Sequence, residues 1–173
     1  KARLHEFDDL KASVLGDYLP AKLGMDEGEQ VIFLCDPGDY SGNLLFVYEN
    51  GKVARVSLAS YATKTNRKRL TGAYCAKSPL IAAFMIREDE EFALYSTENR
   101  ALVFSSASLA VKQSRDTQGV SIMTLKPKYK LSYAARLSES SIQNAPRYKT
   151  KTLPAAGARL NDEDRLDRQM TLL

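Results

Sequence analysis

SLASYATK (57–64) and SSASLAVK (105–112) are two copies of one sequence element, separated by a shift of 48 residues. Five of the eight positions are identical. Upstream, LLFVYENGKVARV (44–56) has the same apolar pattern as FALYSTENRALVF (92–104). A repeat of this length with several strands per copy is typical of propeller blades. Such blades stack because a single sheet cannot bury both of its faces alone.

Short runs rich in β-branched and aromatic residues surround this repeat and predict strands. Asn50-Gly51 is the strongest short hairpin signal, and Glu98-Asn99 takes the same place in the second copy. We therefore predict an all-β fold, a propeller-like and open or partial array of four-stranded blades. The predicted strands are VIFLC (31–35), NLLFVYE (43–49), VARVSL (53–58), LIAAFMI (80–86), EFALYS (91–96), ALVFS (101–105) and VSIMTL (120–125).

The repeat also predicts how a single β-domain is divided. Residues 26–74 and 75–125 form two full blades, and residues 1–25 form the end of a preceding one. Residues 126–146 supply a final strand or closing segment, and residues 147–173 form a C-terminal tail. Two full blades are too few to close a normal propeller.

The bulk composition is that of an ordinary globular domain, with 44% hydrophobic and 27% charged residues in 173. The chain has no apolar run long enough to span a membrane, and its N-terminus lacks a signal-like segment, so we expect a cytoplasmic location without a membrane partner. Cys35 and Cys75 predict buried free thiols, and His5 is the single histidine. We find no phosphate-loop or nucleophile motif, and expect neither an active site nor a cofactor.

The net charge is only +4, but the basic residues are clustered. Residues 50–70 carry six basic and no acidic side chains, and residues 126–151 carry seven basic and one acidic. In contrast, residues 1–30 carry four basic and seven acidic side chains. Clustered positive charge indicates a polyanionic partner. The alternative is that these runs are ordinary solvated loops, which a repeat would also duplicate.

NGKVARVSLASYATK (50–64) and STENRALVFSSASLAVKQSRDTQGVSIMTLK (96–126) resemble consecutive blades of the C-terminal domain of bacterial type IIA topoisomerase A subunits. These are the A subunit of DNA gyrase and its equivalent in topoisomerase IV. Gly51 and Arg55 match the family's hairpin pattern, and SRDTQGV (114–120) matches the element that leads into the next strand. The second hairpin departs from the pattern.

This resemblance implies a β-pinwheel, in which adjacent blades exchange strands. It implies a non-catalytic unit that binds and bends duplex DNA for an ATP-dependent topoisomerase. The family's catalytic tyrosine belongs to a separate breakage-reunion domain, which we do not expect in this chain. The implied partners are duplex DNA, that domain and the ATPase subunit of the holoenzyme, and the implied location is the nucleoid.

Carried over by position, the resemblance implies a set of DNA-contact residues, each able to bind phosphate by charge or hydrogen bond. None is an obvious reader of base edges, so little sequence specificity is expected. No catalytic or metal-binding residue is predicted. The predicted contacts are Lys52, Arg55, Lys64, Arg67, Lys68, Arg69, Arg100, Lys112, Arg115, Lys126, Lys128 and Lys130.

One departure bears on the type of topoisomerase. The gyrase member of the family carries the glycine-rich basic box QRRGGKG, whereas NRKRLTG (66–72) is basic but lacks the paired glycines. The resemblance therefore implies a role closer to that of topoisomerase IV than to gyrase-like wrapping.

Two alternatives remain open. One is a protein-interaction propeller fragment with no nucleic-acid role, which would expose an apolar patch in place of basic residues. The other concerns NDEDRLDRQMTLL (161–173), which could compete with DNA as an acidic tail, form a short helix capped by Asn161, or be disordered.

Overall fold

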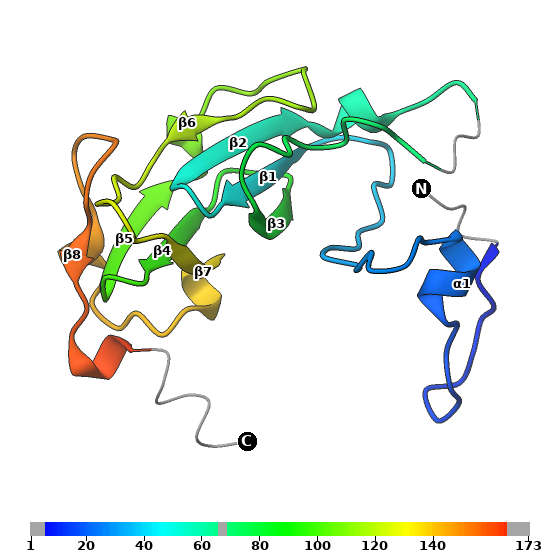
Figure 1. Ribbon diagram of the computed structural model, residues 1–173, viewed down its shortest axis with the longest axis horizontal. Helices are drawn as coiled ribbons and strands as arrows, with labels where there is room; N and C mark the ends of the chain where they lie inside the picture. The colour runs from blue at the N-terminus through cyan, green and yellow to red at the C-terminus, as the bar shows by residue number, and fades with distance from the viewer. Residues whose placement is uncertain (1–5, 66–68, 166–173) are drawn as a thin grey trace.

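The computed structural model describes residues 6–65 and 69–165, and in these ranges it contains two antiparallel four-stranded sheets (Figure 1). The strand orders are β3-β1-β2-β6 and β7-β4-β5-β8. The predicted all-β class is confirmed. The strands are β1 (Asn43–Tyr48), β2 (Lys52–Ser57), β3 (Leu80–Ile86), β4 (Glu91–Ser96), β5 (Arg100–Ser105), β6 (Val120–Ser121), β7 (Leu131–Arg136) and β8 (Ala158–Arg159).

Both predicted hairpins are present, and their registers repeat at the shift of 48 residues. Asn43 pairs with Ser57 in the first hairpin, and Glu91 pairs with Ser105 in the second. The turn residues Gly51 and Asn99 both have positive φ, at 82° and 56°. Glycine and asparagine tolerate this region, which explains why turn residues stand at these two positions.

Each sheet receives strands from further along the chain. Strand β3 pairs with β1, and β7 pairs with β4, each completing the sheet of the hairpin that precedes it. Strand β6 then returns from the second hairpin to pair with β2. The first sheet thus takes β3 and β6 from beyond residue 74, and the second sheet takes β7 and β8 from beyond residue 125.

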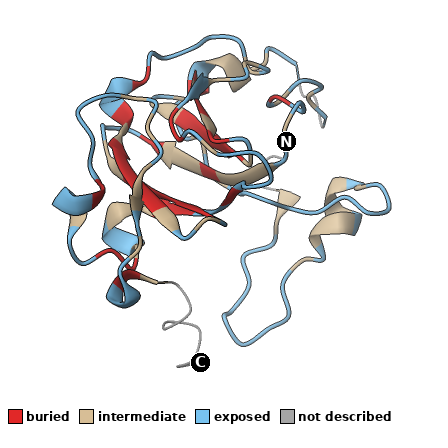
Figure 2. Ribbon diagram, turned by 60° about the vertical axis from the view of Figure 1, so that its left-hand side comes forward, coloured by how far each residue is buried: buried red, intermediate tan, exposed pale blue. Residues whose placement is uncertain are grey.

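The main core lies between the two sheets. Leu45 and Val53 of the first sheet join Phe92, Leu94 and Phe104 of the second in one buried cluster. Neighbouring residues on the same strands point to the opposite face and form separate clusters there, as strand alternation requires. Figure 2 shows the buried residues concentrated in the strands, and because both faces are covered, the hairpin strands β1 and β4 read as nearly continuous apolar runs.

The C-terminal segment covers the outer face of the second sheet. The one-turn helix α2 (Ala145–Tyr148) buries Tyr148 against Tyr95 and Val103. Asp164 is only 2% exposed, and its carboxylate accepts hydrogen bonds from the Tyr148 hydroxyl (2.6 Å) and the Gln143 amide (2.7 Å). The predicted tail is therefore packed as far as residue 165.

Asn161 stands at the N-cap of a 3₁₀ turn, η5 (Asp162–Asp164), but its side chain makes no capping hydrogen bond. The short helix expected in the tail is thus a single turn. It is held by the contacts of the buried Asp164 rather than by a cap.

Two strand predictions were wrong in part or in full. Within the described residues 31–35 form no strand, and Val31, Ile32, Phe33 and Leu34 are 44%, 53%, 36% and 71% exposed. A strand needs a neighbour to satisfy its backbone groups, and no strand of the described ranges lies beside this segment. In the run 120–125, only Val120–Ser121 pairs with a sheet.

The N-terminal stretch lies to one side of the sheets and contains the helix α1 (Leu19–Leu23), which ends at Gly24 with φ of 59° (Figure 1). Cys75 is a buried free thiol as predicted, whereas Cys35 is only half-buried. Burial raises the pKa of the Cys35 thiol. Among the helices of the described ranges, none is long and apolar enough to cross a membrane.

Candidate nucleic-acid interface

Residues 112–121 run along β2 and form what we call the first edge segment. The Lys112 amide donates to the Arg55 carbonyl, and the Ser57 amide donates to the Lys112 carbonyl, both at 2.8 Å. Gly119 has φ of 72°, and a Cβ there would lie 2.3 Å from the Val53 carbonyl oxygen. Backbone hydrogen bonds and this close approach fix the segment against the sheet.

The structure brings the loop after β2 next to this segment. The 3₁₀ turn η2 (Leu58–Tyr61) contacts it, because the Ser60 hydroxyl donates to the Gln113 carbonyl (2.8 Å). The Arg115 guanidinium donates to the Ser60 carbonyl (3.3 Å) and lies over the Tyr61 ring, 5.9 Å from its centroid. A shallow groove of about 410 Å³ lies here between the loop and the segment.

Three predicted residues form this loop-side group: Lys64, Lys112 and Arg115. The two lysines are exposed, and among the described residues neither has an acidic partner. Asp116 lies beside Arg115, and a hydrogen bond from Ser114 lowers the pKa of Asp116, so that it stays ionised. The loop-side group is therefore basic, with one acidic neighbour.

Arg69 is held by acidic residues instead. Its guanidinium contacts Asp26 at 2.9 Å and Glu29 at 3.0 Å, and donates to the Gly24 carbonyl at 2.8 Å. The hydrogen bond to Asp26 is the main cause of the raised pKa of Arg69. A phosphate would have to compete with both carboxylates for this side chain. The neighbouring predictions, Arg67 and Lys68, lie outside the described residues.

Arg55 is largely buried, with a side chain that is 12% exposed. Its guanidinium contacts Asp89 at 2.7 Å and donates to the Ser106 carbonyl at 2.9 Å. The Ser106 hydroxyl in turn donates to Asp89 at 3.1 Å. This network joins β2 to the turns that flank the second hairpin, so Arg55 serves to tie the two sheets together.

The remaining predicted residues lie near the hairpin turns and are partly neutralised. Lys126 and Arg100 both pair with Glu98, and Lys130 pairs with Glu49 at 2.7 Å. Arg100 also donates to the Gly157 carbonyl at 2.6 Å. The other two members of this turn-side group, Lys52 and Lys128, have no acidic partner among the described residues.

The predicted residues therefore do not form one cluster, because even along β2 they lie at two separate levels, and Arg100 lies on β5 of the second sheet. Lys52 begins β2, and Lys112 bridges Val56 near its other end. Lys52 and Val56 are four residues apart along β2, which corresponds to a distance of about 13 Å. The basic residues thus mark both ends of the strand instead of one compact patch.

Residues 149–159 occupy the same position on the second sheet and form the second edge segment. Lys149 bridges Val103 in parallel, as Lys112 bridges Val56. Gly157 also has φ of 72° and approaches the Ala101 carbonyl oxygen as Gly119 approaches that of Val53. Lys149 and Lys151 were not among the predicted contacts. Gly157 follows Lys149 at nearly the same spacing as Gly119 follows Lys112. This shared spacing is the sequence signal that could have found the second edge segment.

No protein-family model matches the chain, and no curated protein sequence matches it either. Solved structures do. The C-terminal domain of DNA topoisomerase IV superposes with a TM-score of 0.66 and 24% identity, over 80% of this chain and 43% of that one. The E. coli ParC C-terminal domain gives a TM-score of 0.60 and 13% identity, over 87% and 68%.

The DNA gyrase A C-terminal domain is a third match, with a TM-score of 0.51 and 18% identity, over 72% of this chain and 46% of that chain. The chain thus spans less than half the length of the first of these structures. Each sheet combines one hairpin with two later strands, so that β3 and β6 join the first hairpin and β7 and β8 join the second. The chain therefore has the β-pinwheel fold seen in the C-terminal domains of topoisomerase IV and gyrase A.

Proposed function

We propose that this chain is a DNA-binding part of the A subunit of a bacterial type IIA topoisomerase. It holds duplex DNA on basic side chains along its sheet edges and breaks no bond itself. The observation that carries the proposal is the loop-side group, where the first edge segment with Lys112 and Arg115 contacts the loop that leads to Lys64, on a fold shared with topoisomerase C-terminal domains.

Phosphate neutralisation supplies the binding free energy in this proposal. Lysine and arginine side chains displace counterions condensed on the duplex, which makes the affinity strongly dependent on salt and only weakly dependent on sequence. Exposed lysines without acidic partners contribute most, because they have no ion pair to give up. Arg55 acts by positioning the sheets, and Arg69 contributes only where phosphate displaces Asp26 and Glu29.

Within the holoenzyme, this unit presents DNA to the breakage-reunion domain of the same polypeptide while the ATPase subunit drives strand passage at the nucleoid in the cytoplasm. The segment NRKRLTG (66–72) lacks the paired glycines of the gyrase box QRRGGKG, which supports bending and capture, as in topoisomerase IV, over gyrase-like wrapping. Religation of a nicked circle with the chain bound tests this choice. Bending without wrapping leaves the linking number unchanged, and a shift would favour wrapping.

Fluorescence anisotropy with a labelled duplex at low salt tests the proposal. Lys112→Gln removes one phosphate contact and should weaken binding several-fold, since each contact adds about 0.9 to the salt slope. Lys11→Gln is the matched control, because Lys11 is also exposed but lies in the N-terminal stretch. Wild-type protein that fails to bind at low salt would overturn the proposal.

The second candidate is a protein-docking unit. The exposed apolar segment 31–34, together with Leu15 at 95% exposure, is the observation that favours it. This candidate predicts no binding to DNA even at low salt, so the same titration separates the two.

A further inference from the structure

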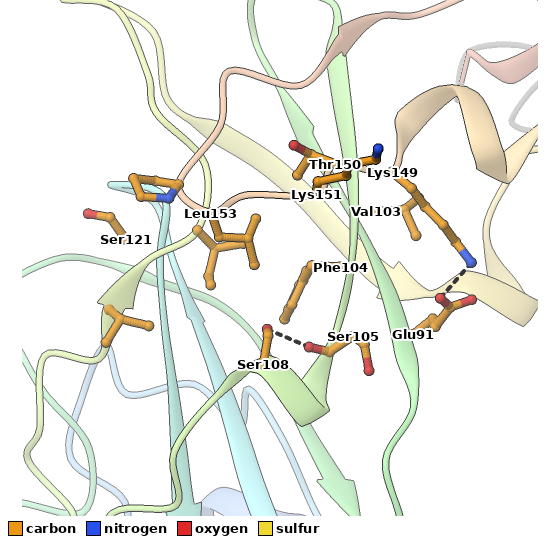
Figure 3. Close-up of a pocket in the computed structure, with 13 residues that line it drawn as sticks. Glu91, Val103, Phe104, Ser105, Ser108, Ser121, Lys149, Thr150, Lys151 and Leu153 are labelled. Atoms are coloured by element: carbon orange, nitrogen blue, oxygen red, sulfur yellow. Dashed lines mark hydrogen bonds and ion pairs between the residues drawn. The ribbon is translucent and has the colours of Figure 1, made fainter.

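A groove of about 600 Å³ separates the strand-β6 end of the first edge segment from the second edge segment (Figure 3). Phe104 and Leu153 form part of its apolar floor, and Ser121 and Thr150 place hydroxyl groups at its walls. Lys149 and Lys151 belong to the second edge segment, which bounds the groove on one side. The groove thus lies between two structurally equivalent segments that both carry basic residues.

The second edge segment is fixed as firmly as the first. The bridge of Lys149 to Val103 and the pairing of β8 with β5 hold it against the second sheet. Gly157 allows the same close backbone approach that Gly119 allows in the first sheet. A basic side chain on this segment is therefore presented by the same backbone arrangement as Lys112.

The two lysines differ in their electrostatic surroundings. Lys151 is exposed, and among the described residues it has no acidic partner. The Lys149 ammonium contacts the Glu91 carboxylate at 2.6 Å, and the two side chains are 45% and 41% exposed (Figure 3). A pair this exposed contributes little to stability, so a phosphate can replace Glu91 as the partner of Lys149.

We infer that the DNA backbone crosses this groove from the first edge segment and binds Lys149 and Lys151, so that the interface spans both sheets. The Ser121 hydroxyl at one wall adds a hydrogen-bond donor to phosphate oxygens, whereas the Thr150 hydroxyl already donates to the Thr152 carbonyl at 3.0 Å. Glu91 competes with the phosphate for Lys149 and so limits the affinity. This inference rests on the proposed function and extends it to the second sheet.

The test measures the affinity for a labelled duplex over a range of salt concentrations for four variants of the full chain. Lys149→Gln with Lys151→Gln should lower the magnitude of the slope of log K against log salt by about 1.8, at 0.9 for each phosphate contact. Glu91→Gln should raise the affinity several-fold, because it frees Lys149 and removes a negative charge. Lys151→Gln alone is the milder substitution, and it keeps the test interpretable if the double variant misfolds. Lys11→Gln is the control that removes the same charge outside the two edge segments.

The outcomes separate this inference from the function it rests on. If the double variant binds with the wild-type slope while Lys112→Gln is weakened, the second edge segment is not part of the interface and the inference is overturned. If Glu91→Gln binds no more tightly than wild type, competition by Glu91 is overturned. If the wild-type chain itself fails to bind at low salt, the proposed function fails instead.

Discussion

At the residue scale, two glycines decide how closely the edge segments approach the sheets. Gly119 and Gly157 share φ of 72°, and a Cβ at either would lie within 2.4 Å of a carbonyl oxygen on the neighbouring strand. Backbone atoms cannot move aside as a flexible side chain can. The two positions therefore require glycine both for conformation and for space.

We predict that Gly119→Ala destabilises the fold by about 3 kcal/mol, the combined cost of the left-handed backbone and of the backbone clash. Gly72→Ala is the control, since Gly72 has φ of 60° but a Cβ added there would meet no atom closer than 4.0 Å. It should lose only about 1 kcal/mol. Urea unfolding measures the free energy of unfolding of both variants. Equal losses of stability would show that Gly119 does not approach the Val53 carbonyl closely.

Asp39 gives a prediction about pH. Hydrogen bonds from Ser41, and then the Arg87 guanidinium, lower the pKa of Asp39 from its usual 3.8 to about 2. A lowered pKa means that the carboxylate stabilises the fold above pH 3.8, and that this contribution is lost as the pH falls towards 2. Asp39→Asn should therefore be less stable than wild type at about pH 6, with the gap closing near pH 2. If the difference in urea midpoint between wild type and Asp39→Asn stays the same from about pH 6 to about pH 2, this explanation is contradicted.

At the element scale, the C-terminal segment acts as a cover for the second sheet, held by the buried carboxylate of Asp164. Tyr148→Phe removes the 2.6 Å hydrogen bond and leaves that carboxylate under-satisfied in a site that is 2% exposed. We expect a loss of about 2 kcal/mol in the free energy of unfolding.

Tyr133→Phe is the matched control for this substitution. Tyr133 is 43% exposed, and its loss of a hydroxyl should change stability by less than about 0.5 kcal/mol. Thermal or urea unfolding of the two variants gives the comparison. If Tyr148→Phe is as stable as Tyr133→Phe, the cover is not held by Asp164.

The hairpins could be predicted from the sequence because their signals are local. The three turn residues 49–51 and the two apolar runs beside them all lie within the 15 residues from Asn43 to Ser57. Whether residues 31–35 form a strand could not be predicted from local sequence, because an apolar run becomes a strand only where a partner strand lies beside it. Its composition matches that of β3, but β3 has β1 as a neighbour.

The same limit applies to the candidate interface. The recurrence of Lys64 at Lys112 could be read from the repeat, and both lysines are exposed, since a repeat keeps equivalent positions equivalent. The burial of Arg55 depends on Asp89, 34 residues away, and the ion pairing of Arg69 depends on Asp26, 43 residues away. Such long-range pairs leave no local pattern in the sequence.

At the scale of the whole molecule, the two sheets give the chain two equivalent edges, and each edge carries basic side chains at a bridge to the sheet. The positive charge is thus distributed along the array, although the net charge is only +4. A distributed charge of this kind suits a long polyanion better than a small anionic ligand.

The central claim is that this chain binds duplex DNA through its edges, and the most direct test is a titration of the wild-type chain with a labelled duplex at a series of salt concentrations. The account predicts binding at low salt and a straight line of log K against log salt with a slope of about −4 or steeper, as several phosphate contacts require. No binding at low salt, or an affinity that does not change with salt, would contradict it.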